Sequence, residues 1–318
     1  MSELKTNKIA TNDTNNVAMD NSLNLKSYTT TQRDSLTSAA GDVIYNSTVG
    51  NPQVYDGSSW NDLKAGMEAF DITYLVVSGG GAGGTNESGD HFGTGGAGGG
   101  ALNSTMPVKK NTSFTVTVGA GGTANIIGNI ATNSQFSTIK PGAGTGHTRT
   151  SREGGSNGYF KGGDYTTKVN NSSGGGAGAG QNGGSTGNAY DGGNGLISTI
   201  ITTSQASSNS VGEVDGSDVY YGGGGSGANN TSSSTVAGTA GKGGGGISAT
   251  GGTAGTVNTG GGGGNSSSGG SGVVILKWAT ADATIGGTRT GLTDGGVQTD
   301  GSNSYIIFTA GTGTVSFS

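Results

Sequence analysis

The sequence has no cysteine, three prolines and few charged residues for its length of 318. The absence of cysteine excludes stabilisation by disulfides, and the scarcity of proline excludes a collagen-like helix. Charged residues make up 11% of the chain, where about 25% is usual. The formal net charge is −5 and no run of Lys or Arg exists. These two features argue against a nucleic-acid partner and against an anionic membrane surface.

Long hydrophobic runs are absent as well. No apolar stretch approaches the roughly 18 residues that a membrane-spanning helix needs, so we expect no membrane insertion. The first residues, MSELKTNKIATNDTNN, lack the apolar region of a secretory signal peptide. We therefore expect a protein that stays in the producing cell or leaves without a signal, for example by assembly into a virus particle.

Glycine is the residue that the chain has in excess. It has 71 glycines, and only four of them precede residue 67. This change in composition predicts two units, residues 1–66 and 67–318. Gly- and Ser-rich segments are often disordered linkers. Here well-formed β segments interrupt the glycine, and a flexible linker has no use for them; they are ITYLVVS (72–78), SFTVTVG (113–119), GVVILKW (272–278) and YIIFT (305–309). We expect an ordered domain.

A dinucleotide-binding turn is the first function that these glycines suggest. YLVVSGGGAGG (74–84) satisfies G-x-G-x-x-G directly after a predicted strand. That motif needs a helix to follow at once, whereas residues 85–100 are rich in glycine, which costs about 1 kcal/mol per helix position relative to alanine. A P-loop is excluded too, because Lys242 is not followed by Ser or Thr. We expect no bound nucleotide or other cofactor.

The glycine runs have an alternative ordered state, in which they wind as extended helices of three residues per turn. Such rods pack side by side through N–H···O bonds and Cα–H···O contacts. A Cβ pointing inward would hold neighbouring rods apart, so the packing requires glycine. The glycines that we assign to this scaffold are Gly79, Gly80, Gly81, Gly222, Gly223, Gly224, Gly260, Gly261 and Gly262.

Residues 1–66 have the pattern of short strands and turns. GDVIYN, PQVYDG and SSWNDL, within residues 41–63, predict a β meander. So few large apolar residues bury only a thin core, and self-association would supply the missing burial. The predicted fold is thus mainly β: a meander, then a β-capped glycine-rich lobe with polyglycine II-type rods and a C-terminal hairpin over about 305–318. We expect a fibrous homotrimer.

Four segments in order resemble the glycine-rich domain of bacteriophage tail-fibre proteins: YLVVSGGGAGG (74–84), FTVTVGAGG (114–122), GGGGS (222–226) and GGSGVVILKW (269–278). Residues 23–60 are similar to a short module that joins fibres to virions in marine and cyanobacterial phages. YIIFTAGTGTVSFS (305–318) resembles an element that the family often places before its first glycine-rich strand. In this chain the element lies at the C-terminus instead. We therefore expect it to close the sheet from the other end or to contact a neighbouring subunit.

The resemblance implies a virion protein, assembled in the host cytoplasm, that acts as a tail fibre or adhesin. The N-terminal residues would contact tail or capsid proteins of the phage. The distal lobe would bind a bacterial surface glycan or an outer-membrane protein. Alternatives are a purely structural virion component, such as a head fibre or a connector, a bacterial surface adhesin, and a polysaccharide depolymerase. TVSFS, at the C-terminal end, favours the structural alternative if it pairs with the open sheet edge of a partner.

Receptor binding is expected in loops, where a rigid support presents variable side chains. Aromatic faces stack on sugars, and guanidinium groups bind carboxylate or phosphate. The candidates are Tyr159, Phe160, Tyr165, Tyr190, Tyr220, Tyr221, Arg149 and Arg152. The alternative is that these rings pack under the loops as small cores.

No metal site or catalytic residue is predicted, and we do not expect an enzyme. Glu213, Asp215 and Asp218 do not match a calcium loop, so a solvated acidic turn is expected. His91 and His147, the two histidines, have no second ligand at a recognisable spacing. Hydrolysis of a polysaccharide usually needs two carboxylates about 5–10 Å apart, and the spacing of Glu153, Asp164 and Asp191 singles out no pair.

Overall fold

The structure is a computed structural model that describes residues 24–63, 69–84, 93–124, 131–146, 153–163, 173–184, 190–231, 234–249, 251–286 and 289–318. The chain divides into two compact units, Met1–Glu68 and Ala69–Ser318, which we call the N-terminal unit and the glycine-rich unit. This boundary, after residue 68, lies two residues beyond the boundary after residue 66 that the change in glycine content predicted.

The N-terminal unit is a four-stranded sheet with one short helix. Strands β2 (Val43–Asn46), β3 (Asn51–Tyr55) and β4 (Trp60–Asp62) form the expected antiparallel meander, and β1 (Ser27–Tyr28) adds to β2 in parallel. The sequence analysis did not predict helix α1 (Thr30–Asp34), which begins with a capping box between Thr29 and Gln32.

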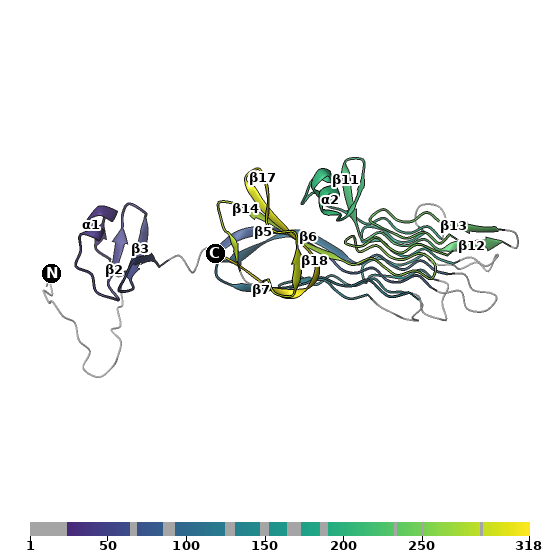
Figure 1. The fold of residues 1–318 in the computed structure, drawn as a ribbon, viewed down its shortest axis with the longest axis horizontal. Coiled ribbons are helices and arrows are strands. Elements are labelled where there is room, and N and C mark those ends of the chain that lie inside the picture. The colour runs from purple at the N-terminus through teal and green to yellow at the C-terminus, as the bar shows by residue number, and fades with distance from the viewer. Residues whose placement is uncertain are drawn as a thin grey trace, which may run out of the picture. The chain divides into compact units, whose positions relative to one another are not determined.

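The glycine-rich unit has a curled nine-stranded sheet at one end (Figure 1). Six of its strands are neighbours in the order β6 (Ala101–Lys109), β5 (Ala69–Val77), β14 (Val273–Ala279), β18 (Asn303–Phe317), β7 (Ser113–Thr117) and β8 (Gln135–Phe136). The short strands β15 (Ile285–Gly286), β16 (Leu292–Asp294) and β17 (Gln298–Asp300) also pair with β18. The four β segments that were expected to interrupt the glycine each contribute a strand to this sheet.

The C-terminal hairpin predicted over 305–318 is wrong, because these residues belong to one long strand, β18. Its first half pairs with β14 and its second half, from Thr312 to Ser316, pairs with β7. Gly311, with φ of +94°, lies between the two halves and its backbone conformation strongly favours glycine. The strand therefore bends from one part of the sheet to the other and closes it within the chain.

Alternating residues of these strands fill two cores, one on each face of the sheet. Ile72, Tyr74 and Val76 of β5 join Phe114, Val116 and Phe317 in the first core. Leu75 and Val77 point the other way, into a second core. A small cap covers that second core; it consists of β9 (Leu196–Ile197), α2 (Thr203–Asn209), β10 (Glu213–Asp215) and β11 (Asp218–Tyr221). The alternation of side chains along these strands therefore divides them between the two cores.

The glycine runs extend from the sheet as a bundle of rods, at whose far end lies the hairpin of β12 (Ala228–Thr231) and β13 (Ser234–Ala237) (Figure 1). The rods have neither helix nor strand structure, yet their amides are hydrogen-bonded. Rod 95–100 shows the pattern. Residues 95 and 98 donate to rod 174–179, residues 96 and 99 to rod 260–264, and residues 97 and 100 to rod 142–146. A chain that turns once every three residues produces this alternation.

At most glycine positions within the rods, the close packing leaves no room for a side chain. A Cβ added to Gly80 or Gly81 would lie within 3.0 Å of a carbonyl group on a neighbouring rod, and the same holds for Gly79, Gly223, Gly224, Gly261 and Gly262. The predicted rod packing is confirmed for these seven. Gly222 and Gly260 also lie against neighbouring carbonyl oxygens, 2.5 and 2.6 Å from an added Cβ, and their φ values of +73° and +74° are a second reason for glycine. They are turn residues at the start of their rods, beside the sheet.

We predict that Gly262→Ala destabilises the protein, because the new methyl group would overlap the backbone of Gly96 and Ala97. The free energy of unfolding should fall by about 3 kcal/mol. Gly295→Ala is the matched control, since its Cβ would make only ordinary contacts at 3.6 Å and its φ is not positive, so its effect should stay within about 0.5 kcal/mol. Denaturation in urea measures both. Equal stability of the two variants would contradict the packing.

Candidate functional site

The structure does not gather the predicted receptor-binding aromatics into one site. Tyr159 and Phe160 lie on the turn after Asn157, whose side-chain amide donates to the carbonyls of Gly98 and Gly178 near the sheet end of the rods. Tyr190 lies at the other end, where its carbonyl accepts from Gly227, the residue before β12. Tyr220 is on β11 in the cap. Of these side chains, that of Tyr159 is the most open, with 63% of the residue exposed.

Tyr221 was predicted to contact a receptor, and the structure corrects this assignment. Its side chain is fully buried in the second core, against Val219 and the aliphatic residues of the sheet. Alternation on β11 directs Tyr220 outward and Tyr221 inward. Burial raises the pKa of the Tyr221 hydroxyl, which has no hydrogen-bond partner. The alternative of a packing role is correct for this residue.

Several sequence candidates fall on residues that the structure does not describe. Arg149, Arg152 and Tyr165 lie outside the described residues, as do His91, His147 and Asp164. Of the other two carboxylates considered for hydrolysis, Glu153 is exposed and Asp191 is buried, where its side chain accepts from the Thr239 amide at 2.7 Å.

Two of the three carboxylates of the 213–218 turn, Glu213 and Asp215, have separate contacts. Glu213 accepts from the amides of Gly243 and Gly244 at 2.7 and 2.6 Å and so attaches the cap to the rods. Asp215 forms an ion pair with Lys242, which raises the pKa of that lysine. The Lys242 ammonium also lies 5.4 Å from the centre of the Tyr220 ring. Within the part of the chain that the structure describes, no group of three or more acidic or histidine side chains is placed to hold a metal ion.

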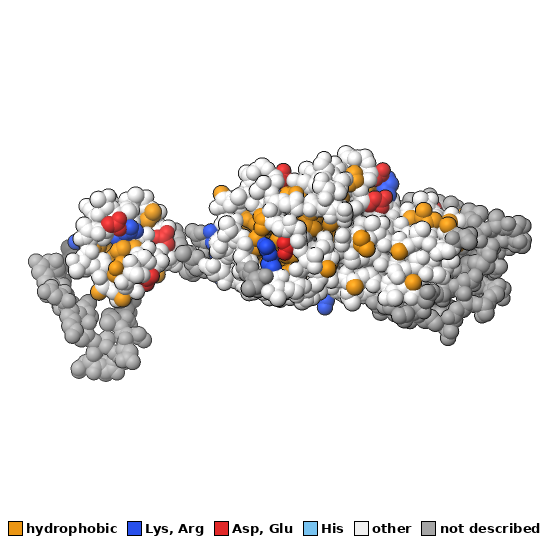
Figure 2. Space-filling model, in the orientation of Figure 1, with side chains coloured by type: hydrophobic (Ala, Val, Ile, Leu, Met, Phe, Trp, Pro, Cys, Tyr) orange, Lys and Arg blue, Asp and Glu red, His pale blue; other side chains and the backbone are white. Residues whose placement is uncertain are grey.

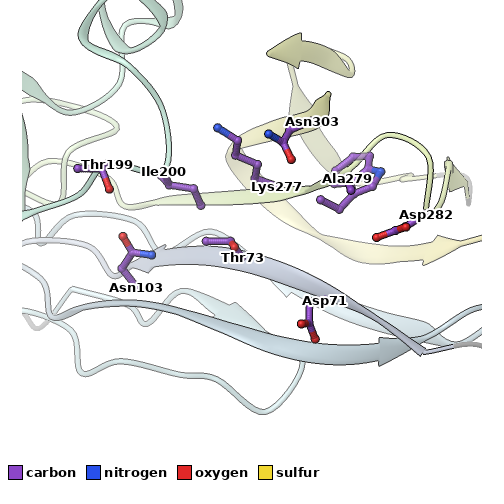
Figure 3. A pocket seen from close by; sticks show the side chains of 10 residues that line it. Asp71, Thr73, Asn103, Thr199, Ile200, Lys277, Ala279, Asp282 and Asn303 are labelled. Atoms are coloured by element: carbon purple, nitrogen blue, oxygen red, sulfur yellow. The ribbon is translucent and has the colours of Figure 1, made fainter. Parts of the chain in front are cut away.

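A polar groove lies on the second face of the sheet, next to the cap (Figure 3). Along β5 the residues on this face change from Leu75 and Val77, beneath the cap, to Asp71 and Thr73, which line the groove. Lys277 of β14 lies beside Thr73 in register. Thr199 and Ile200 lead into the cap and lie at one end, Asp282 lies at the opposite end, and Asn303 lies next to Lys277 (Figure 3).

Contacts within the groove fix several of its polar groups. The Lys277 ammonium binds Asp300 at 2.7 Å and thereby lowers the pKa of that carboxyl. The Asn103 side chain donates to the Tyr74 carbonyl and accepts from the Ser198 hydroxyl. The groove is suited to binding hydroxyl or cationic groups, since Asp71 and Asp282 provide two carboxylates. The sequence analysis missed it, although the change from apolar to polar residues on one face of β5 was a usable signal.

Few charges lie elsewhere on the visible face of the glycine-rich unit. The rod region there is mostly backbone and uncharged polar side chains, while hydrophobic side chains gather mainly toward the sheet end (Figure 2). Binding in the rod region would therefore depend on hydrogen bonds and on isolated rings such as Tyr159.

A pair of buried tyrosines tests the corrected role of Tyr221. Tyr221→Phe should raise the free energy of unfolding by about 1 kcal/mol, because it removes a buried hydroxyl that has no partner. Tyr305→Phe in the same core is the control with the opposite sign. The Tyr305 hydroxyl donates to Gln298 at 2.7 Å, so its loss should lower the free energy of unfolding by a similar amount. Urea denaturation that finds both variants destabilised would overturn the assignment.

Comparison with known proteins identifies the family. The family model of a glycine-rich domain matches residues 56–279, well over half of the chain. Comparison with curated proteins and with solved structures gave no significant match. Among the described residues, no helix has the length and hydrophobicity to span a membrane. The matched range contains the glycine rods, the cap and two neighbouring strands of the sheet, β5 and β14. The chain therefore belongs to the glycine-rich domain family.

Proposed function

We propose that this protein is a phage fibre protein that attaches to the virion through its N-terminal unit and recognises the host cell surface through its glycine-rich unit. The observation that carries the proposal is the rod bundle. Rods that hydrogen-bond to neighbours in three directions form a stiff support without a hydrophobic core of their own. A stiff support that presents turns and short hairpins at its ends suits adhesion.

Self-association of the fibre is supported by an apolar sheet face on the N-terminal unit. Val43, Tyr45, Pro52, Val54 and Leu63 lie on one face, since Tyr45 pairs with Pro52 and the Leu63 amide donates to the Pro52 carbonyl. Val43, Tyr45 and Leu63 are 41%, 37% and 47% exposed. Association of three copies would bury this face and present three distal units together, which strengthens weak single contacts.

The rival interpretation as a connector loses its main support. It depended on an open strand, TVSFS, at the C-terminal end. In the structure Val315 and Ser316 pair with β7, and Ser316 and Phe317 pair with β15 on the other side. One edge of Thr314–Ser316 is therefore paired with β7, and β15 pairs with the other edge at Ser316 and Phe317. Host recognition is the function that we favour.

Adhesion is tested by adding labelled full-length protein to cells of candidate bacterial hosts. We expect saturable binding, and we expect at least one of Tyr159→Ala, Tyr190→Ala and Tyr220→Ala to weaken it about tenfold. Tyr221→Phe is the control and should bind like the unchanged protein, because that ring is buried. No saturable binding of the folded protein to any strain that the phage infects would contradict the proposal.

The oligomeric state tests the apolar face separately. Val43→Glu with Leu63→Glu should convert the oligomer to monomer, because the carboxylates would be buried in the interface. Val257→Glu, at a position that is 62% exposed on the glycine-rich unit, is the control and should leave the oligomer intact. Sedimentation equilibrium gives the masses. A wild-type monomer at micromolar concentration, or an oligomer that tolerates both glutamates, would refute the role of this face.

A further inference from the structure

The N-terminal unit has a second surface feature, a pocket on the opposite face of its sheet from the apolar residues described above. Tyr55 and Trp60, paired across β3 and β4, contribute aromatic rings. Residues 33–38, the end of α1 and the segment after it, contribute Arg33, Asp34 and Ser38. The turn at Ser58 and Ser59 completes the pocket. The lining thus combines two rings with a guanidinium, a carboxylate and hydroxyls.

The two rings are held in a fixed arrangement. Their centres lie 5.4 Å apart and their planes are inclined at 48°. Both residues are partly exposed, although the unit has few large apolar residues to spare. An exposed aromatic surface next to polar groups is suited to the C–H face of a sugar ring, which stacks on it while the hydroxyls point outward.

The polar groups are also fixed in place. The Arg33 guanidinium, on a side chain that is only 16% exposed, donates to Asp34 Oδ1 at 2.9 and 2.6 Å and to Gln53 at 2.8 Å. Both bonds to Asp34 end on Oδ1, so Oδ2 keeps its lone pairs for a hydroxyl. On the rim, the Asp56 carboxylate accepts from the amides and hydroxyls of Ser58 and Ser59, and these bonds lower the pKa of Asp56. The turn is therefore rigid.

One hydroxyl in the pocket has no partner within the protein. Ser38 Oγ is buried and makes no hydrogen bond. A buried hydroxyl without a partner costs about 1–3 kcal/mol, so such groups are rare and need an explanation. Because Ser38 Oγ has almost no surface open to solvent, a ligand would remove this cost only by displacing the atoms that cover the hydroxyl.

The charges decide which class of ligand fits. An anion is disfavoured because Asp34 already neutralises Arg33 and would repel it. A metal ion would find a single carboxylate among the lining residues, and an apolar ligand would leave the Ser38 hydroxyl and Asp34 Oδ2 without partners. A neutral ring with several hydroxyls satisfies all of these groups. We propose that this pocket binds a saccharide, by stacking on Trp60 and Tyr55 and by hydrogen bonds to Asp34 and Ser38.

This saccharide site is independent of the proposed host recognition, which we assign to the glycine-rich unit.

Saccharide binding is measured on the full chain with methyl glycosides of glucose, galactose, mannose and N-acetylglucosamine. Sorbitol is the control, because it has hydroxyls and no ring. The protein has two tryptophans, so Trp278→Phe leaves Trp60 as the only one and its fluorescence reports on the pocket. Titration calorimetry on the unchanged protein gives the same information if that variant does not fold.

We expect at least one glycoside to bind saturably and change the Trp60 fluorescence, and sorbitol to have no effect. Trp60→Ala should weaken binding by about tenfold or more. Ser38→Ala is the sharper variant. It should weaken binding about fivefold while the unfolding midpoint of the free protein stays the same or rises, because the unpartnered hydroxyl is gone.

Ser47→Ala is the matched control, since its hydroxyl donates to the Tyr28 carbonyl elsewhere in the same unit and does not line the pocket. Its affinity for the glycoside should equal that of the unchanged protein. The proposal is overturned if no glycoside binds, if sorbitol binds as well as the glycosides, or if Ser38→Ala and Ser47→Ala bind with equal affinity.

Discussion

The close approach of one main chain to another, with no Cβ between them, is the constraint on which the glycine-rich unit depends. Ordering glycine costs more conformational entropy than ordering any other residue, so the rods need a compensating gain. The gain comes from amides that bond in three directions, as in rod 95–100, and from contacts too close for any side chain. Each rod is thus stabilised by its neighbours, and the bundle forms only as a whole.

The sheet supplies what the rods lack. Most of the large buried side chains belong to the two cores of the sheet, and rods such as 79–84 and 267–272 continue directly into or out of β5 and β14. The sheet therefore sets where these rods begin. The cap then ties the rods to the sheet through Glu213, whose carboxylate accepts from two rod amides. A hydrophobic core at one end and a hydrogen-bonded bundle beyond it make a support whose functional groups lie at turns and sheet faces.

The N-terminal unit is organised by a different principle. On its helix-covered face Asn46 and Arg33 both donate to Gln53, beside Ile44 and the Tyr55–Trp60 pair, while its uncovered face is apolar. A small unit with one largely buried apolar residue on its sheet, Ile44, has little core of its own. The exposed apolar face is consistent with association between copies. The pocket at Trp60 lies on the other face of the sheet.

Local patterns in the sequence determined the strands, the meander at 43–62 and the requirement for glycine in the rods, because period-2 alternation and the absence of a Cβ act on neighbouring atoms. Two T-x-x-Q capping boxes, at Thr29 and Thr202, also mark the two short helices, which were not predicted.

Only the tertiary structure decided the strand pairings and the burial of individual side chains. It bent β18 at Gly311 into two pairings, made Gly222 and Gly260 turn residues, buried Tyr221 and placed Lys277 beside Thr73. These outcomes depend on which distant segments meet, and a composition dominated by glycine contains almost no information on that pairing.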